Sequence, residues 1–391
     1  MTRSLTPSMT RRSFLATSAA TLAATRLHAA PVAPAKAVYI ASSTKGPTAG
    51  LYASIWNPTT ATLSSPRLVA PLEGGSFFAV GSQAGKRRIF SGHQSAPKVG
   101  ALSSYNAAPP TDLTADLTLI NTITVPEFDF VHVVLDHTQR CLVTASYGTA
   151  KVMSVKIAPD GRLSAPVSQF NITGSGPDPT RQTSPHPHGV CFSPDNKFVF
   201  INDLGTDRIM VYRLNPATAE LTPHTTPYFQ CTPGSGPRHL AFHPSGKWAY
   251  SVNELDSTLT QLAWNAAKGT FTLVSTTSTL LHQEDVAGAR AGEVLFDSSG
   301  RTLYSCNRGS LDELVTCRVA PATGKITVIQ RLPLEAKEAR HYTLTPDGSS
   351  LLVAEQFSDR VAVFARDSKD GTLKPTPNTY PVTTPTCVLF A

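Results

Sequence analysis

A strand-turn-strand unit recurs about every fifty residues along the chain, and this repeat limits the possible folds more than any other feature. Each copy contains a polar hairpin that ends in one apolar residue, as in Asn57–Ser64, Ala158–Ser164 and Asn265–Thr272. The apolar residues that end the hairpins are Leu63, Leu117, Leu163, Leu221, Phe271, Ile326 and Leu373. Their spacings of 54, 46, 58, 50, 55 and 47 residues indicate seven copies of one supersecondary unit.

The other half of each unit is a tight turn followed by an alternating strand. Clear copies are Ser193–Asp203, His243–Glu254, Asp297–Arg308 and Thr345–Gln356. Pro-Asp-Gly and Pro-Ser-Gly favour turns because Pro presets one dihedral angle and Gly supplies a positive one. The β-branched and aromatic residues that follow favour strands. Units of about fifty residues without helical periodicity predict an all-β, seven-bladed β-propeller with four-stranded antiparallel blades.

A ring of blades needs a closure, and the two ends of the repeat region supply one. Ala37–Ile40 and Cys387–Phe390 are both short apolar runs typical of strands. We expect these two segments to share one blade, because their pairing removes an exposed sheet edge.

The first thirty residues do not match the repeat. Thr10–Leu15 contains a twin-arginine pattern, and a mildly apolar stretch and the small residues Ala29 and Ala30 follow it. These features are typical of a bacterial Tat export signal. The apolar stretch is too short and too weakly hydrophobic for a membrane span. We therefore expect a signal over residues 1–30, a single propeller domain over 31–391, and a periplasmic or secreted protein without a membrane span.

The charge balance gives no indication of a nucleic-acid partner. The whole chain has a formal net charge of +7, but four arginines and no acidic residue lie in the first thirty residues. The remainder carries a net charge of +3, with no basic stripe. We expect a monomer that binds a small molecule.

The six cysteines show no metal-binding spacing. Cys141, Cys191, Cys306 and Cys317 lie within strand patterns, which favours buried free thiols. An exported protein can also hold a disulfide, and Cys306 and Cys317 are the nearest pair in sequence.

Registering the repeats on their turns separates shared positions from variable ones. His188, Arg238 and Arg340 occupy one equivalent position before the turn, whereas Glu254 and Arg308 are equivalent positions after it. Strands joined by a tight turn are antiparallel, so the start of one lies beside the end of the next. Both variable positions should then lie at the same end of every blade and form a polar ring at the mouth of the central channel.

The predicted ring has the chemistry of a site for an oxygen-rich anion. Its members are His188, Arg238, Glu254, Arg308 and Arg340, with Asn253, Asn307, Asp203 and His239 beside them. Arginine binds carboxylates and phosphates through paired hydrogen bonds. Either Glu254 or His188 can act as general base on water, and an arginine can stabilise an oxyanion.

Two segments of the chain resemble a known family. Residues 185–214 and 236–255 are similar to the hallmark segments of the bacterial lactonase family of seven-bladed propellers, which includes the cycloisomerase-type 6-phosphogluconolactonases. The chain also resembles fungal carboxy-cis,cis-muconate lactonizing enzymes. The resemblance implies that the catalytic residues are His188, Arg238, Glu254 and Arg308, and that no metal takes part. From their places in the ring we expect the substrate-binding residues to be Arg340, Asn253, Asn307, His239 and Asp203. We expect no cofactor.

These observations predict an exported lactonase, a carboxylic ester hydrolase that opens a sugar-acid-type lactone to the hydroxy acid. A muconate-type cycloisomerase would use the same arginines. A propeller that binds a glycan or protein without catalysis is a third hypothesis. A calcium-dependent lactonase could use Asp203, Asn253 and Glu254 as oxygen ligands, although the nearby arginines oppose a dication.

Overall fold

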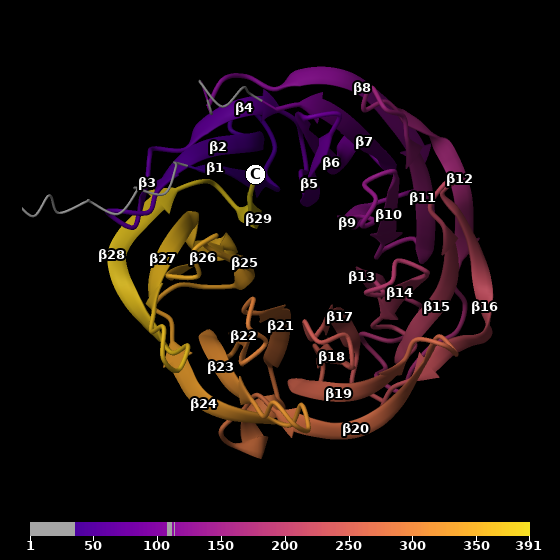
Figure 1. The fold of residues 1–391 in the computed structure, drawn as a ribbon, viewed down its shortest axis with the longest axis vertical. Coiled ribbons are helices and arrows are strands. Elements are labelled where there is room, and N and C mark those ends of the chain that lie inside the picture. The colour runs from indigo at the N-terminus through magenta and orange to yellow at the C-terminus, as the bar shows by residue number, and fades with distance from the viewer. Residues whose placement is uncertain (1–35, 108–111, 113) are drawn as a thin grey trace, which may run out of the picture. The chain divides into compact units, whose positions relative to one another are not determined.

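The computed structural model describes residues 36–107, 112 and 114–391. In these ranges the strands form seven antiparallel sheets that surround a central axis (Figure 1). The predicted seven-bladed all-β propeller is therefore confirmed. The predicted export signal over residues 1–30, and the domain boundary that follows it, lie outside the described residues.

Six blades follow the chain outward from the axis, and each has four strands in sequential order. The first three of these blades are β5 (Phe77–Gln83), β6 (Lys86–Ala96), β7 (Val99–Asn106) and β8 (Thr118–Pro126); β9 (Phe130–Leu135), β10 (Cys141–Ser146), β11 (Lys151–Ile157) and β12 (Leu163–Asn171); and β13 (Pro187–Phe192), β14 (Phe198–Asp203), β15 (Arg208–Asn215) and β16 (Glu220–Gln230). The next three are β17 (Pro237–Phe242), β18 (Trp248–Asn253), β19 (Thr258–Asn265) and β20 (Thr270–Ser278); β21 (Ala289–Phe296), β22 (Thr302–Gly309), β23 (Glu313–Val319) and β24 (Ile326–Pro333); and β25 (Ala339–Leu344), β26 (Ser350–Glu355), β27 (Arg360–Arg366) and β28 (Leu373–Pro381).

The seventh blade joins the two ends of the described chain. Its innermost strand is β29 (Pro385–Phe390), which pairs with β1 (Lys36–Ser42), and β1 pairs with β2 (Gly50–Asn57). The outermost position is divided between β3 (Thr62–Leu63) and β4 (Arg67–Pro71), both of which pair with β2. The predicted ring closure is confirmed, because Ala37–Ile40 and Cys387–Phe390 lie within β1 and β29.

The turns between the first two strands of a blade have the predicted backbone geometry. Gly246, Gly300 and Gly348 occupy the left-handed region with φ between 69° and 71°, and Asn196 takes the equivalent position with φ of 59°. Glycine has no Cβ to oppose this conformation, and asparagine tolerates it. The turns thus fix the register of each hairpin and place the preceding inner strand.

The hydrophobic core is divided among the contacts between blades. In the described residues, seven buried clusters each combine side chains from two neighbouring blades. At the closure, Val38 and Val388 pack against Leu352 and Val361. All seven apolar residues that end the polar hairpins are buried. Burial of this apolar surface stabilises each contact between neighbouring blades. Because every blade makes the same kind of contact, the apolar residues recur at the same position of each repeat.

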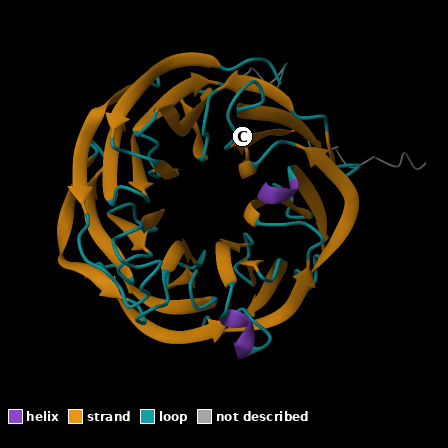
Figure 2. Cartoon of the chain, turned by 180° about the vertical axis from the view of Figure 1, so that it is seen from behind, coloured by secondary structure: helices purple, strands orange, loops and turns teal. Residues whose placement is uncertain are grey.

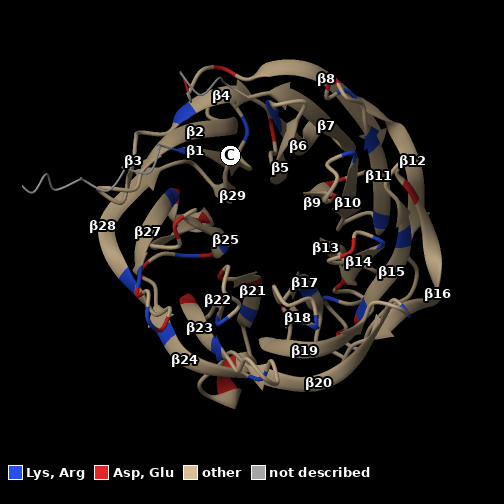
Figure 3. Cartoon of the chain, viewed as in Figure 1, with Lys and Arg blue, Asp and Glu red and all other residues tan. Residues whose placement is uncertain are grey.

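The remaining features are local. Helical turns in the described residues are confined to two 3₁₀ segments, η1 (Gln283–Val286) and η2 (Gln356–Ser358) (Figure 2). Within that part of the chain, no helix has the length and apolar character needed to cross a membrane. All six cysteines are free thiols, and five of them are buried. Basic and acidic residues are mixed around the ring (Figure 3).

Candidate active site

Five inner strands share a backbone irregularity at the same end of the propeller. The pairing register shifts by one residue near the start of β9, β13, β17, β25 and β29. The residues left without a paired neighbour are Val131, His188, Arg238, Arg340 and Thr386. A bulge of this kind turns a side chain out of the regular alternation of a strand. It therefore gives these five positions a common direction.

The bulged residues line one small cavity of about 40 Å³. Its wall is completed by Ser76, Phe77, His239 and Glu293. Every one of the seven blades contributes at least one of these residues, so the cavity lies where the inner strands converge on the axis (Figure 1). A space of this volume has room for a few water molecules or one small functional group.

The predicted antiparallel arrangement of the two variable positions is confirmed. Pro187 pairs with Asp203, Pro237 with Asn253, and Arg290 with Arg308. The start of the inner strand therefore lies beside the end of the second strand in each of these three blades.

Glu254 is the centre of a buried ion-pair network. Its Oε1 lies 2.6 Å from Nη2 of Arg181, and its Oε2 lies 3.2 Å from Nε of Arg238 and 3.1 Å from Nη2 of Arg308. Burial raises the pKa of Glu254, but the three guanidinium groups, led by Arg308, outweigh it and hold this pKa at about 2. Glu254 is therefore an anchored carboxylate at neutral pH.

Arg308 and Arg340 differ in how fully they are paired. Arg308 is 1% exposed and bonds both Glu254 and Glu338. Arg340 has a side chain that is 29% exposed, and its Nη1 lies 3.8 Å from Glu338. The guanidinium group of Arg340 makes no hydrogen bond to any residue in the described part of the chain, and its nearest acid is Glu338. Burial, with Arg238 and Arg308 nearby, lowers the pKa of Arg340 to about 9. An anion in the cavity would offset this unfavourable environment.

A second group of buried side chains forms a hydrogen-bonded chain behind the cavity. Glu293 Oε1 lies 2.7 Å from Nδ1 of His239, and Nε2 of His239 lies 3.0 Å from Nδ1 of His188. Burial lowers the pKa of both histidines, that of His188 more strongly. Burial raises the pKa of Glu293, but His239 outweighs it and holds this pKa well below its usual range. The chain thus contains one carboxylate and two neutral imidazoles.

Three predicted substrate-binding residues lie at the expected end of their blades but do not line the cavity. Asp203 accepts hydrogen bonds from the backbone of His186 and Gly205. Asn253 donates to Thr258 and Thr260 of its own blade. Asn307 bonds Thr279 and Glu313. Their polar groups hold the adjacent loops.

Of the nine predicted site residues, four line the cavity, namely His188, Arg238, His239 and Arg340. Glu254 and Arg308 lie behind Arg238 in the ion-pair network. Three further members of these networks were not predicted from the sequence, namely Glu293, Glu338 and Arg181. Glu293 could have been found, because registration on the turns places it at the position of His239 and His341.

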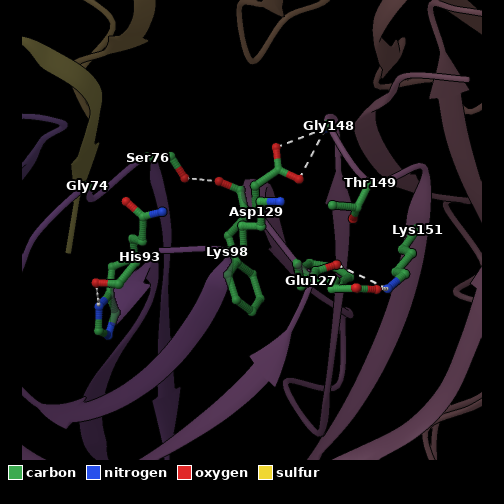
Figure 4. Close-up of a pocket in the computed structure, with 12 residues that line it drawn as sticks. Gly74, Ser76, His93, Lys98, Glu127, Asp129, Gly148, Thr149 and Lys151 are labelled. Atoms are coloured by element: carbon green, nitrogen blue, oxygen red, sulfur yellow. Dashed lines mark hydrogen bonds and ion pairs between the residues drawn. The ribbon is translucent and has the colours of Figure 1, made fainter. Parts of the chain in front are cut away.

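A larger cleft of about 670 Å³ lies beside the cavity, over the blades β5–β8 and β9–β12 (Figure 4). Ser76 lines both spaces. Asp129 accepts two hydrogen bonds from the backbone N–H of Gly148 on the cleft wall, and Lys151 pairs with Glu127 at 3.4 Å. A cleft of this volume suits a small organic ligand.

No group of three or more His, Cys, Asp or Glu side chains with the geometry to hold a metal ion occurs in residues 36–107, 112 and 114–391. Of the residues considered for calcium, Glu254 carries three arginine partners, which repel a dication.

Residues 37–390 match the family model for lactonases with a seven-bladed β-propeller. The 6-phosphogluconolactonase of Bacillus subtilis is 29% identical over 353 residues, which cover 90% of this chain and 97% of that protein. The 6-phosphogluconolactonase of Serratia proteamaculans is 31% identical and aligns over 64% of this chain and 71% of its own length.

A solved structure is similar to this chain over nearly its whole length. The periplasmic gluconolactonase of Pseudomonas aeruginosa superposes with a TM-score of 0.82 at 28% sequence identity. The superposition covers 91% of this chain and 99% of that one. The sequence and structural matches therefore extend over almost all of the propeller.

Proposed function

Because this chain belongs to the lactonase family of seven-bladed β-propellers, we propose that it hydrolyses a sugar-acid-type lactone to the hydroxy acid. The observation that carries the proposal is the axial cavity, on which His188, Arg238 and Arg340 converge. A neutral imidazole beside two guanidinium groups provides a base and a positive environment for an oxyanion.

Between the two candidate bases, the geometry favours His188. Both oxygens of Glu254 are engaged by arginines, and a pKa of about 2 makes this carboxylate a weak base. His188 lines the cavity and is neutral. We assign general-base catalysis to His188, and to Glu254 and Arg308 the role of holding Arg238 in place.

The reaction then follows in two stages. His188 takes a proton from water, and the hydroxide adds to the lactone carbonyl to give a tetrahedral oxyanion facing Arg238. The ring C–O bond breaks, and the imidazolium of His188 returns the proton to the departing alkoxide. The product is the open-chain hydroxy acid, and His188 is neutral again.

The sizes of the two spaces indicate how the substrate lies. The axial cavity of about 40 Å³ admits the reacting carbonyl but not a whole sugar ring. The cleft of about 670 Å³ shares Ser76 with it and can hold the remainder of the substrate. Arg340, with unused hydrogen-bond donors, is the best receptor for a carboxylate or phosphate on that substrate.

Export is part of the proposal. The twin-arginine pattern at Thr10–Leu15 supports a periplasmic or secreted enzyme, and the Pseudomonas aeruginosa relative is a periplasmic gluconolactonase. Cytosolic 6-phosphogluconolactone is then not the physiological substrate. We propose that the enzyme acts as a monomer.

The test is a panel of sugar lactones assayed by proton release, with and without a chelator, beside a muconate cycloisomerisation assay. We expect lactone hydrolysis that chelation does not change. His188→Gln should lower kcat by about 10²- to 10⁴-fold, the range for general acid-base catalysis. Loss of activity on chelation would indicate a metal enzyme. Turnover of muconate alone would indicate a cycloisomerase, and no turnover at all would favour a binding propeller.

A further inference from the structure

We propose that Glu293 and His239 are positioning residues, which fix His188 in the tautomer that presents an unprotonated Nε2 to the axial cavity. The inference rests on the proposed function, because His188 is the base of that reaction. It adds two residues from neighbouring blades, β21–β24 and β17–β20, to the catalytic arrangement.

In the hydrogen-bonded chain of Glu293, His239 and His188, the direction of each hydrogen bond follows from the charge of Glu293. Glu293 is ionised and can only accept, so His239 donates from Nδ1 across the 2.7 Å contact. His239 is neutral, so its Nε2 carries no proton and accepts from Nδ1 of His188 across 3.0 Å. His188 is neutral as well, so its Nε2 keeps a free lone pair. Three side chains from three blades thus specify one tautomer.

The carboxylate itself is held in a fixed orientation. The Oε1 atom of Glu293 that binds His239 also accepts from the backbone N–H of Val294 at 3.0 Å. Glu293 is 7% exposed, and His239 and His188 are 5% and 4% exposed. Because these side chains are almost fully buried, few solvent molecules compete for the two hydrogen bonds that orient the imidazoles.

The groups around His188 explain why a carboxylate is needed at the other end of the hydrogen-bonded chain. Arg238, Arg340 and His132 oppose a positive charge on His188, and Tyr147 packs edge-on at 5.9 Å. His188 becomes an imidazolium after it takes a proton from water. Glu293 is the negative charge that stabilises this imidazolium through His239.

Two nearby histidines, His132 and His341, lie outside the hydrogen-bonded chain of Glu293, His239 and His188. His132 stacks on His239 at 4.7 Å, and its Nδ1 accepts from the backbone N–H of Val190. His341 Nδ1 accepts from the backbone N–H of Val388 at 3.3 Å. Its ring is bonded to this backbone N–H and not to the hydrogen-bonded chain, so His341 serves as a matched control.

The tautomer can be measured without any substrate. Long-range ¹H–¹⁵N spectra of full-length protein labelled at the imidazole nitrogens distinguish protonated from unprotonated ring nitrogens. We expect His188 to show a protonated Nδ1 and a free Nε2, with its signals identified by their loss in His188→Gln. His239→Phe keeps an aromatic ring but removes the acceptor, and it should abolish this pattern. A protonated Nε2 in the wild type, or an unchanged pattern in His239→Phe, would overturn the proposal.

Kinetics test the charge of Glu293. Glu293→Gln keeps an oxygen acceptor for His239 but removes the negative charge. It should lower kcat by about 10- to 100-fold, a part of the effect of the base itself, with KM unchanged. The acid limb of the kcat profile should move to lower pH, because the base loses a stabilising charge. His341→Gln should leave kcat and this limb unchanged. An unchanged acid limb in Glu293→Gln would contradict the proposal.

The same variants separate this inference from the proposed function. If His188 shows the stated tautomer but His188→Gln retains full kcat, the assignment of the base is wrong and the hydrogen-bonded chain stands. If His188→Gln loses activity while His239→Phe and Glu293→Gln do not, the base stands and the positioning role is wrong.

Discussion

Arg238 Nε lies 3.2 Å from Oε2 of Glu254, and this contact joins the axial cavity to a carboxylate that two further arginines share. Arg238 is 2% exposed and Glu254 is 6% exposed. Removing the carboxylate would leave buried guanidinium groups without their shared partner. The contact therefore connects the stability of the propeller with the position of Arg238, a side chain that lines the axial cavity.

Glu254→Gln should destabilise the protein by about 3–5 kcal/mol, the usual cost of breaking a buried ion pair from one side. Urea unfolding at neutral pH measures the change in the free energy of unfolding. Glu355→Gln is the control, because Glu355 is equally buried but pairs with the partly exposed Arg360 alone. A Glu254→Gln protein as stable as the wild type would show that the network does not hold the blades.

Stability should also fall as the solution becomes acidic. Burial lowers the pKa of His341 from 6.5 to about 4, and the arginines lower that of Glu254 from 4.5 to about 2. Between pH 6.5 and about 4 for His341, and between pH 4.5 and about 2 for Glu254, the unfolded chain binds more protons than the folded one. Protonation in these intervals therefore favours unfolding. Stability is complete above about pH 6.5, declines first through the histidine and falls again below about pH 4.5.

Urea unfolding between pH 8 and pH 3 measures this decline. His341→Gln should reduce the loss of stability between pH 6.5 and pH 4, because that site no longer titrates. A wild-type unfolding free energy that is constant down to pH 4 would contradict the assigned neutral state of the buried histidine.

Much of the propeller fold could be predicted from the sequence, because the repeat indicates the number of blades and the position of their strands. Leu63 and Leu373 end the polar hairpin in the first and last repeats, and both are buried. Registration on the turns also placed His188, Arg238 and Arg340 at one position, and each is a bulge on an inner strand.

The contacts between side chains of neighbouring blades could not be predicted from the sequence. The partnership of Glu293 with His239 depends on the angle between two blades, which no repeat encodes. The hydrogen bonds of polar side chains to their own loops could not be predicted either. Asn253 lies at the predicted end of its blade, but its amide is used by Thr258 and Thr260. A polar residue at a loop can bind either its own turn or a ligand, and its identity does not decide which.

Arg340→Gln should raise KM for lactones that carry a phosphate or carboxylate by roughly 10- to 100-fold, corresponding to one charged hydrogen-bonding group. KM for uncharged glucono-lactone should change little, because the free donors of Arg340 then have no anion to bind. Steady-state kinetics on the two substrates gives the comparison. Arg208→Gln is a control, since Arg208 stacks on Tyr228 away from the cavity. Equal effects on both substrates would show that Arg340 acts on the lactone carbonyl and not on a substrate anion.

Gln94→Trp should narrow the cleft without touching the axial cavity, because Gln94 lines only the larger space. If the cleft holds the body of the substrate, the bulkier side chain should raise KM for lactones with a large substituent more than for small unsubstituted ones. Gln94 is exposed, so the change should leave stability within about 0.5 kcal/mol, as is usual for surface sites. The KM ratio between a disaccharide-derived lactone and a simple lactone is the quantity to measure. A ratio equal to that of the wild type would place the substrate elsewhere on this face.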